Sequence, residues 1–119
     1  MKDFKKQIIW QRSHTLTLKI YKATKTFPKE ELYGLTSQIR RAIVSIPTNI
    51  AEGCGRRTNA ELANFLNIAS GSASEVEYEL LIAKELEYIT TEQYNLWTQE
   101  ICEIRSMLAA YMHKLKTDR

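Results

Sequence analysis

The sequence is poor in glycine, proline and cysteine, and each shortage excludes a class of protein. Four glycines and two prolines, with no Ser-rich or Gln-rich run, indicate no linker and no disordered tail beyond a few terminal residues. The cysteines, Cys54 and Cys102, lack the spacing of a zinc site or a redox CxxC motif, so we expect buried thiols in a reducing compartment. No apolar run approaches the roughly 18 to 20 residues that span a bilayer. Residues 1–10 lack a signal-peptide pattern, so we expect a soluble, cytoplasmic protein without membrane contact.

Charge is divided unevenly between the two halves of the chain. Residues 1–60 hold twelve Lys and Arg against four Asp and Glu, a net charge of +8. Residues 61–119 hold five against ten, a net charge of −5. This division predicts either an anionic partner for the basic half or a head-to-tail contact between copies of the chain.

Apolar residues recur at spacings of three and four, which is the period of a helix face. The pattern predicts a first helix over residues 9–27, ending before Pro28, and a connector with a helical turn of its own. A second helix is predicted to begin shortly after Gly34 and to run toward Cys54. The small residues of NIASGSASE, residues 67–75, predict that a neighbouring helix approaches closely there.

Two capping-box patterns mark the starts of two further helices. Thr58 with Glu61, and Thr90 with Gln93, have the spacing at which each side chain bonds a free backbone N–H of the other residue. Four amphipathic helices with short connections predict one all-α domain over residues 1–119, an antiparallel up-and-down four-helix bundle.

Pro47 lies inside the second predicted helix. It removes a backbone donor, which costs about 3 kcal/mol in a regular helix interior, so we expect a kink at Pro47. Thr48 or Asn49 is expected to bond the freed carbonyls. The alternative is a hinge that exposes Asn49 or Glu52 to a partner.

The segment GCGRR, residues 53–57, lacks both the spacing of a phosphate-binding P-loop and a preceding strand. We therefore expect Gly53 or Gly55 to end the second helix in the left-handed conformation, with Arg56 and Arg57 in the following turn.

No residue pattern predicts a metal or a cofactor. His14 and His113 have no second ligand at helical spacing, and the chain has no ExxH motif of the kind found in di-iron bundles. A catalytic set would have to be assembled from Glu52, Asn49 and His14, so we expect a protein that is not an enzyme.

The basic half supplies candidates for contacts with nucleic acid. The first are two arginine pairs at the ends of the second helix, about 20 Å apart at 1.5 Å per residue, which could bracket one face. Lysines of the first helix come second. The candidates are Arg40, Arg41, Arg56, Arg57, Lys19, Lys22 and Lys25. Aromatic residues are not interleaved with these charges, so stacking on single-stranded bases is not indicated.

Residues 33–89, with the segments LTSQIRR, SIPTNIAEG and FLNIASGSASE, strongly resemble a family first met as proteins encoded in intervening sequences of bacterial 23S ribosomal RNA genes. The resemblance implies a four-helix bundle that assembles into a homopentameric ring, with no catalytic activity and no cofactor. A related branch, the accessory variability determinant of diversity-generating retroelements, binds a reverse transcriptase and nucleic acid. Positions that match the family signature are Pro47, Asn49, Glu52 and Gly53, whereas Ile43 and Thr48 depart mildly from it.

The resemblance gives the charge division a concrete interpretation. A ring of identical subunits joins two different surfaces, so the basic half of one copy is expected to face Glu75, Glu79 and Glu85 of the next. The sequence therefore predicts an oligomeric scaffold that binds RNA, DNA or a nucleic-acid-processing protein. The alternative is a purely structural or protein-interaction oligomer, in which the charges serve assembly alone.

Overall fold

The structure is a computed structural model that describes residues 2–118, so the outermost residues of the predicted 1–119 domain lie outside it. Four long helices are present in this range: α1 (Ile8–Thr24), α2 (Leu35–Cys54), α3 (Asn59–Glu85) and α4 (Thr91–Thr117). Two short 3-10 turns, η1 (Phe4–Lys6) and η2 (Lys29–Glu31), precede α1 and α2.

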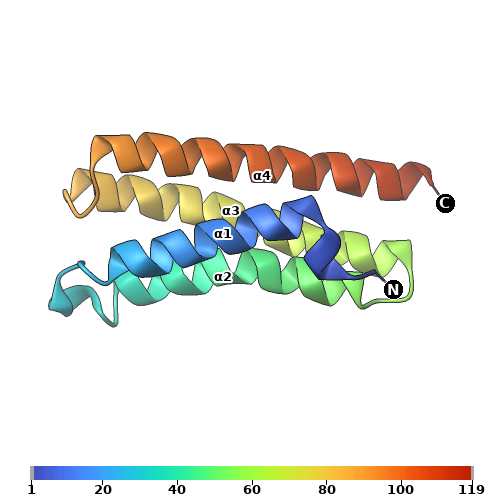
Figure 1. The fold of residues 1–119 in the computed structure, drawn as a ribbon, viewed down its shortest axis with the longest axis horizontal. Coiled ribbons are helices and arrows are strands. Elements are labelled where there is room, and N and C mark those ends of the chain that lie inside the picture. The colour runs from blue at the N-terminus through green and yellow to red at the C-terminus, as the bar shows by residue number, and fades with distance from the viewer. Residues whose placement is uncertain (1, 119) are drawn as a thin grey trace.

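The helices form an up-and-down bundle of 47 × 23 × 20 Å. Each helix packs against the next along the chain, and α1 also contacts α4. Figure 1 shows the four helices aligned along the long axis, with both chain ends at one end of the bundle. The predicted all-α four-helix bundle is confirmed.

The first helix is shorter than predicted, because its last residues change to a tighter turn. α1 ends at Thr24, and the N–H of Phe27 bonds the Thr24 carbonyl three residues back at 3.1 Å. Phe27 is still buried, as its place in the apolar pattern predicted. The helical turn predicted in the connector is η2.

One of the two predicted capping boxes forms in full. The Thr90 hydroxyl accepts from the Gln93 N–H at 3.0 Å, and the Gln93 side chain accepts from the Thr90 N–H at 2.9 Å. Thr58 accepts from the Glu61 N–H at 3.1 Å, but its hydroxyl donates to the Glu61 carboxylate at 3.0 Å. The Glu61 carboxylate therefore binds the Thr58 hydroxyl and not the Thr58 N–H. The prediction of a full capping box at this position is wrong.

The prediction of a left-handed glycine at the end of α2 is also wrong. Gly55 is right-handed, with φ of −84°, and Gly53 is still inside the helix. Within residues 2–118 the only positive φ belongs to Glu87, at 64°. Gly53 has a packing role, because a Cβ there would lie 2.7 Å from Leu62 Cδ1 and 3.0 Å from Phe65 Cβ. The missing side chain lets α2 approach the start of α3 closely.

The carbonyl freed by Pro47 lies against a hydroxyl group of another helix. α2 continues through Pro47, and the kink itself stays a prediction. The Ile43 carbonyl, which loses the N–H four residues on, lies 3.3 Å from the hydroxyl of Thr17 on α1. That hydroxyl has one proton and shares it with the Ser13 carbonyl, which is closer at 2.7 Å. The side-chain amide of Asn49 binds the Ser45 carbonyl at 2.8 Å instead. The expected local bond is therefore absent, and the Ile43 carbonyl has only a shared contact across the α1–α2 interface.

The core is continuous along the bundle and is built from the predicted apolar seams. Ala69 and Ala73 are fully buried, which confirms the close helix approach expected for this segment. Gly71 lies on the other side of α3, where a Cβ would meet nothing within 4 Å. Cys54 is buried and Cys102 is half-buried, and both thiols are free.

Candidate nucleic-acid interface

Arg40 is fixed on the outside of the α1–α2 contact. Its Nε donates to the Thr24 hydroxyl at 2.8 Å, and its guanidinium binds the Tyr21 carbonyl at 3.3 Å. The same guanidinium lies 5.2 Å from the centre of the Tyr21 ring. These contacts orient Arg40 without neutralising its charge, because both oxygens are uncharged.

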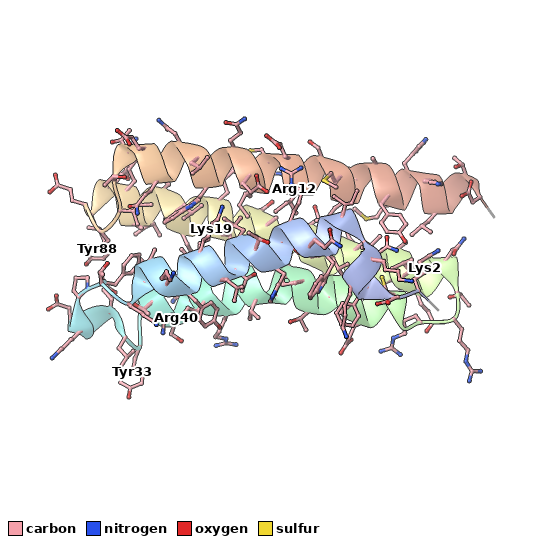
Figure 2. The ribbon with its side chains drawn as sticks, in the orientation of Figure 1. Lys2, Arg12, Lys19, Tyr33, Arg40 and Tyr88 are labelled. Atoms are coloured by element: carbon pink, nitrogen blue, oxygen red, sulfur yellow. The ribbon has the colours of Figure 1, made fainter. Side chains whose placement is uncertain are left out.

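Three lysines extend this positive charge along α1. Lys19, Lys22 and Lys25 are exposed, and at 100° per residue they share the outer arc of the helix. Figure 2 shows Lys19 on the α4 side of α1 and Arg40 on the α2 side, so the charges wrap around the helix. We call these four residues, Lys19, Lys22, Lys25 and Arg40, the α1 basic face. Lys22 and Lys25 also lie at the helix C-terminus, where the helix dipole favours cations.

Sequence reasoning missed the apolar residues within the α1 basic face. Leu18 and Tyr21 are 57% and 37% exposed between these cations. An aromatic ring is therefore in contact with one of the cations. The contact between Tyr21 and Arg40 is hard to predict from the sequence, because it joins two helices and has no fixed spacing in the chain.

The other three arginine candidates lie away from this face. Arg41 lies on the α3 side of α2, where it lines a cleft, whereas Arg40 lies on the α1 side. Arg56 lies at the far end of α2, 3.8 Å from the Glu52 carboxylate and 4.8 Å from the Phe65 ring centre. Arg57 is exposed in the adjacent turn. The two arginine pairs therefore do not bracket one face.

Arginines of the same chain neutralise part of the acidic half. Arg12 of α1 binds Glu100 at 2.9 Å and also binds Glu103, which joins α1 to α4. The bond to Arg12 lowers the pKa of the Glu103 carboxyl. Arg105 of α4 binds Glu77 of α3 at 2.6 Å. The ion pairs of Arg12 and Arg105 thus use two cations to neutralise three carboxylates within the bundle.

The members of the α1 basic face have no such partners. Within residues 2–118, the ion pairs involve Arg12, Arg56 and Arg105, and none involves Lys19, Lys22, Lys25, Arg40, Arg41 or Arg57. A concentration of unneutralised cations on one side of the bundle favours contact with an anionic partner.

The three glutamates predicted at a subunit interface have different surroundings. Glu75 and Glu85 are exposed on α3, whereas Glu79 is only 3% exposed inside the chain. Burial, together with the neighbouring Glu75, raises the pKa of Glu79 to about 7. Only Glu75 and Glu85 are therefore placed to meet another subunit directly.

A shallow groove between α1 and α2 holds part of the signature set. Its lining residues are Phe4, Trp10, His14, Val44, Pro47, Thr48, Ala51 and Glu52. The Trp10 and His14 rings are stacked, with centres 4.7 Å apart. Asn49 and Gly53 are not in this lining, because they contact Ser45 and α3. The set His14, Glu52 and Asn49 is therefore not assembled at one site.

Metal-ligating residues and membrane-spanning helices also bear on function. In the part of the chain that the structure describes, no three His, Cys, Asp or Glu residues are grouped so that they could hold a metal ion. Within the same residues no helix is both long and apolar enough to cross a membrane.

Comparison with known proteins identifies the family. Residues 5–110 match the family model described as 23S rRNA-intervening sequence protein. A crystal structure from Bacteroides thetaiotaomicron, described as a protein with unknown function from the S23 ribosomal protein family, is similar at 30% identity and a TM-score of 0.79. The alignment covers 88% of this chain and 98% of that chain. The search of curated proteins gives no match. The comparisons indicate no catalytic family, and the chain belongs to the 23S rRNA-intervening sequence protein family.

Proposed function

We propose that this chain is a non-enzymatic, oligomeric scaffold that binds nucleic acid, RNA or DNA, or a nucleic-acid-processing protein such as a reverse transcriptase. The observation that carries the proposal is the unpaired charge of the α1 basic face. Arginines of the same chain bind Glu77, Glu100 and Glu103, whereas Lys19, Lys22, Lys25 and Arg40 have no carboxylate partner within residues 2–118. Phosphate groups would supply the missing counter-charge.

The geometry of this face supports contacts with the nucleic-acid backbone. Arg40 is already held by Thr24 and Tyr21, so its guanidinium loses less conformational freedom when it binds a phosphate. The exposed lysines next to it are flexible point charges that adapt to spacing. Such a face favours affinity over sequence readout, because phosphate contacts carry no sequence information directly.

Fluorescence anisotropy of labelled RNA and DNA tests the proposal. Binding is expected to weaken steeply between about 50 and 200 mM salt, because each phosphate contact releases a counterion. Replacing Lys22 and Lys25 together by alanine is expected to reduce the slope of log affinity against log salt by about 2. The matched control replaces Lys114 and Lys116, which are also exposed in the last turn of a helix, and is expected to leave the slope unchanged. Binding that is absent at low salt, or equal in both pairs of variants, contradicts the proposal.

A purely structural or protein-interaction oligomer is the second candidate, and the outer side of α3 favours it. Ile68 and Tyr78 are 51% and 63% exposed there. Gly71 lies between them with open space beside it, so a partner helix could approach closely. Such apolar exposure around a small residue favours contact with another protein surface.

Light scattering on the purified protein tests assembly separately from nucleic-acid binding. The proposed pentamer predicts a mass five times that of the chain, held in part by the basic half facing Glu75 and Glu85. Raising the salt concentration, or replacing both glutamates by glutamine, is expected to lower the mass. A monomer under all conditions contradicts the oligomer, and an unchanged larger mass contradicts its electrostatic part.

A further inference from the structure

A polar cleft between α2 and α3 lies outside the α1 basic face and so is not used by the proposed nucleic-acid contact. It has a volume of about 550 Å³, and its lining residues are Gln38, Arg41, Ala42, Ser45, Ser72 and Glu75. Small side chains on both helices leave this space open at the helix contact. The Ser72 hydroxyl donates to the Ser45 hydroxyl at 2.8 Å, and the Asn49 amide donates to the same oxygen at 2.9 Å. The hydroxyl pair is therefore held in place from both helices.

The cleft carries opposite charges that are not paired with each other. Arg41 from α2 and Glu75 from α3 both line it and are both exposed. Within residues 2–118 neither takes part in an ion pair of 4.0 Å or less. The arginines that join other helices, Arg12 and Arg105, do bind carboxylates directly. Arg41 and Glu75 therefore each have a charge available to a ligand in the cleft that they line.

A buried carboxyl group, that of Glu79, favours the binding of a cation near Glu75. Glu79 lies one helical turn beyond Glu75 and seven residues beyond Ser72, so it is on the same side of α3 as both lining residues. Glu79 is only 3% exposed, and its Oε1 atom has no hydrogen-bond partner. Burial first, and then the charge and hydrogen bonding of Glu75, raise its pKa. A nearby cation would favour the ionised form of these carboxyl groups.

We propose that the α2–α3 cleft binds a small aminocarboxylate, whose carboxylate group contacts Arg41 and whose ammonium group contacts Glu75. The serine hydroxyls and the Gln38 amide provide neutral hydrogen bonds between the two charged groups. The charges exclude simpler ligands. Glu75 repels a plain anion such as phosphate, Arg41 repels a plain amine, and two carboxyl groups are too few to hold a metal ion here.

Isothermal titration calorimetry with a graded set of compounds tests this site. Glycine, β-alanine and 4-aminobutyrate place increasing lengths of chain between the two charges, while butylamine and butyrate each carry one charge. One or more of the aminocarboxylates is expected to bind, and both single-charge compounds are expected to bind about tenfold more weakly or not at all. No binding by any aminocarboxylate at about 10 mM, or equal binding of butylamine or butyrate, overturns the proposal.

Substitutions locate the binding within the chain. Arg41→Ala and Glu75→Gln are each expected to weaken the best aminocarboxylate about tenfold. Arg57→Ala removes an exposed arginine at the far end of α2 and is expected to leave the affinity unchanged. Circular dichroism confirms that each variant is folded. Unchanged affinity in Glu75→Gln overturns the assignment to this cleft.

The result is separable from the proposed nucleic-acid function. Glu75→Gln removes a negative charge, so it does not weaken the attraction of phosphate to the α1 basic face. Loss of aminocarboxylate binding in this variant, with intact nucleic-acid binding and an unchanged mass by light scattering, supports two independent sites. The same loss together with a lowered mass assigns Glu75 to the subunit contact and overturns the cleft. The same loss in both assays indicates a general defect of the variant and contradicts a specific ligand contact.

Discussion

Replacing Glu79 by glutamine should change how the stability of the protein depends on pH. The pKa of Glu79 is raised from 4.5 to about 7, first by burial and then by Glu75. Between these values the folded chain retains a proton that the unfolded chain releases, so the free energy of unfolding falls as the pH rises. A shift from 4.5 to about 7 corresponds to about 3 kcal/mol, lost progressively over that window.

Glu79→Gln keeps the shape of the side chain but cannot ionise, so the variant should lack this loss. Near pH 5, at about 298 K, wild type and variant are expected to agree within about 1 kcal/mol, because both side chains are then uncharged. At about pH 8 the variant is expected to be more stable by about 3 kcal/mol. Urea unfolding followed by circular dichroism measures both values, at one protein concentration because the chain is proposed to assemble.

The control for this experiment is Glu85→Gln, which removes an exposed carboxylate from the same helix. Its stability should follow the wild-type dependence on pH. Parallel pH profiles for wild type and Glu79→Gln would refute the reasoning, because they would mean that Glu79 ionises normally in the folded chain. In that case the buried carboxyl would also lose its role in the α2–α3 cleft.

Two further predictions concern packing and the proline. Gly53→Ala is expected to destabilise the fold by about 1 kcal/mol, because the added Cβ would lie 2.7 Å from a buried leucine, whereas Gly71→Ala is expected to stabilise it by about 0.5 to 1 kcal/mol. Urea unfolding should show these opposite signs, and equal shifts would contradict the packing role. Thr17→Val is expected to cost about 1 kcal/mol, because it removes the hydroxyl proton that the Ser13 and Ile43 carbonyls share. The cost should shrink when Pro47→Ala restores the missing N–H, and a double-mutant cycle without coupling would contradict the Thr17 contact.

The prediction of the helices succeeded where local chemistry decides the structure. Apolar spacing located all four helices, and the Thr90 capping box formed as predicted because both partners lie within one turn. Errors were confined to ends and turns. The left-handed glycine was wrong because Gly53 is needed for the contact with Leu62, and no local pattern distinguishes these two uses of glycine.

The candidate site was predicted in its residue types but not in its arrangement. The excess of positive charge in residues 1–60 identified the cations of α1 and α2 as candidates, and their binding role stays a prediction. It did not show that Arg40 and Arg41, adjacent in the chain, contact different helices, α1 for Arg40 and α3 for Arg41. Adjacent residues of a helix are 100° apart, so only the packing of α2 between α1 and α3 gives each arginine its neighbours.

Periodicity, caps and composition by themselves determined that this chain is a four-helix bundle with a basic first half. These properties depend on residues within one or two turns of each other, which the linear order already brings together. Tertiary structure alone decided that Thr17 lies against the Ile43 carbonyl, that Arg12 neutralises Glu100, and that the Oε1 atom of Glu79 is buried without a hydrogen-bond partner. The physical reason is that the rotation of each helix about its own axis is set by packing, and this rotation selects which distant side chains meet.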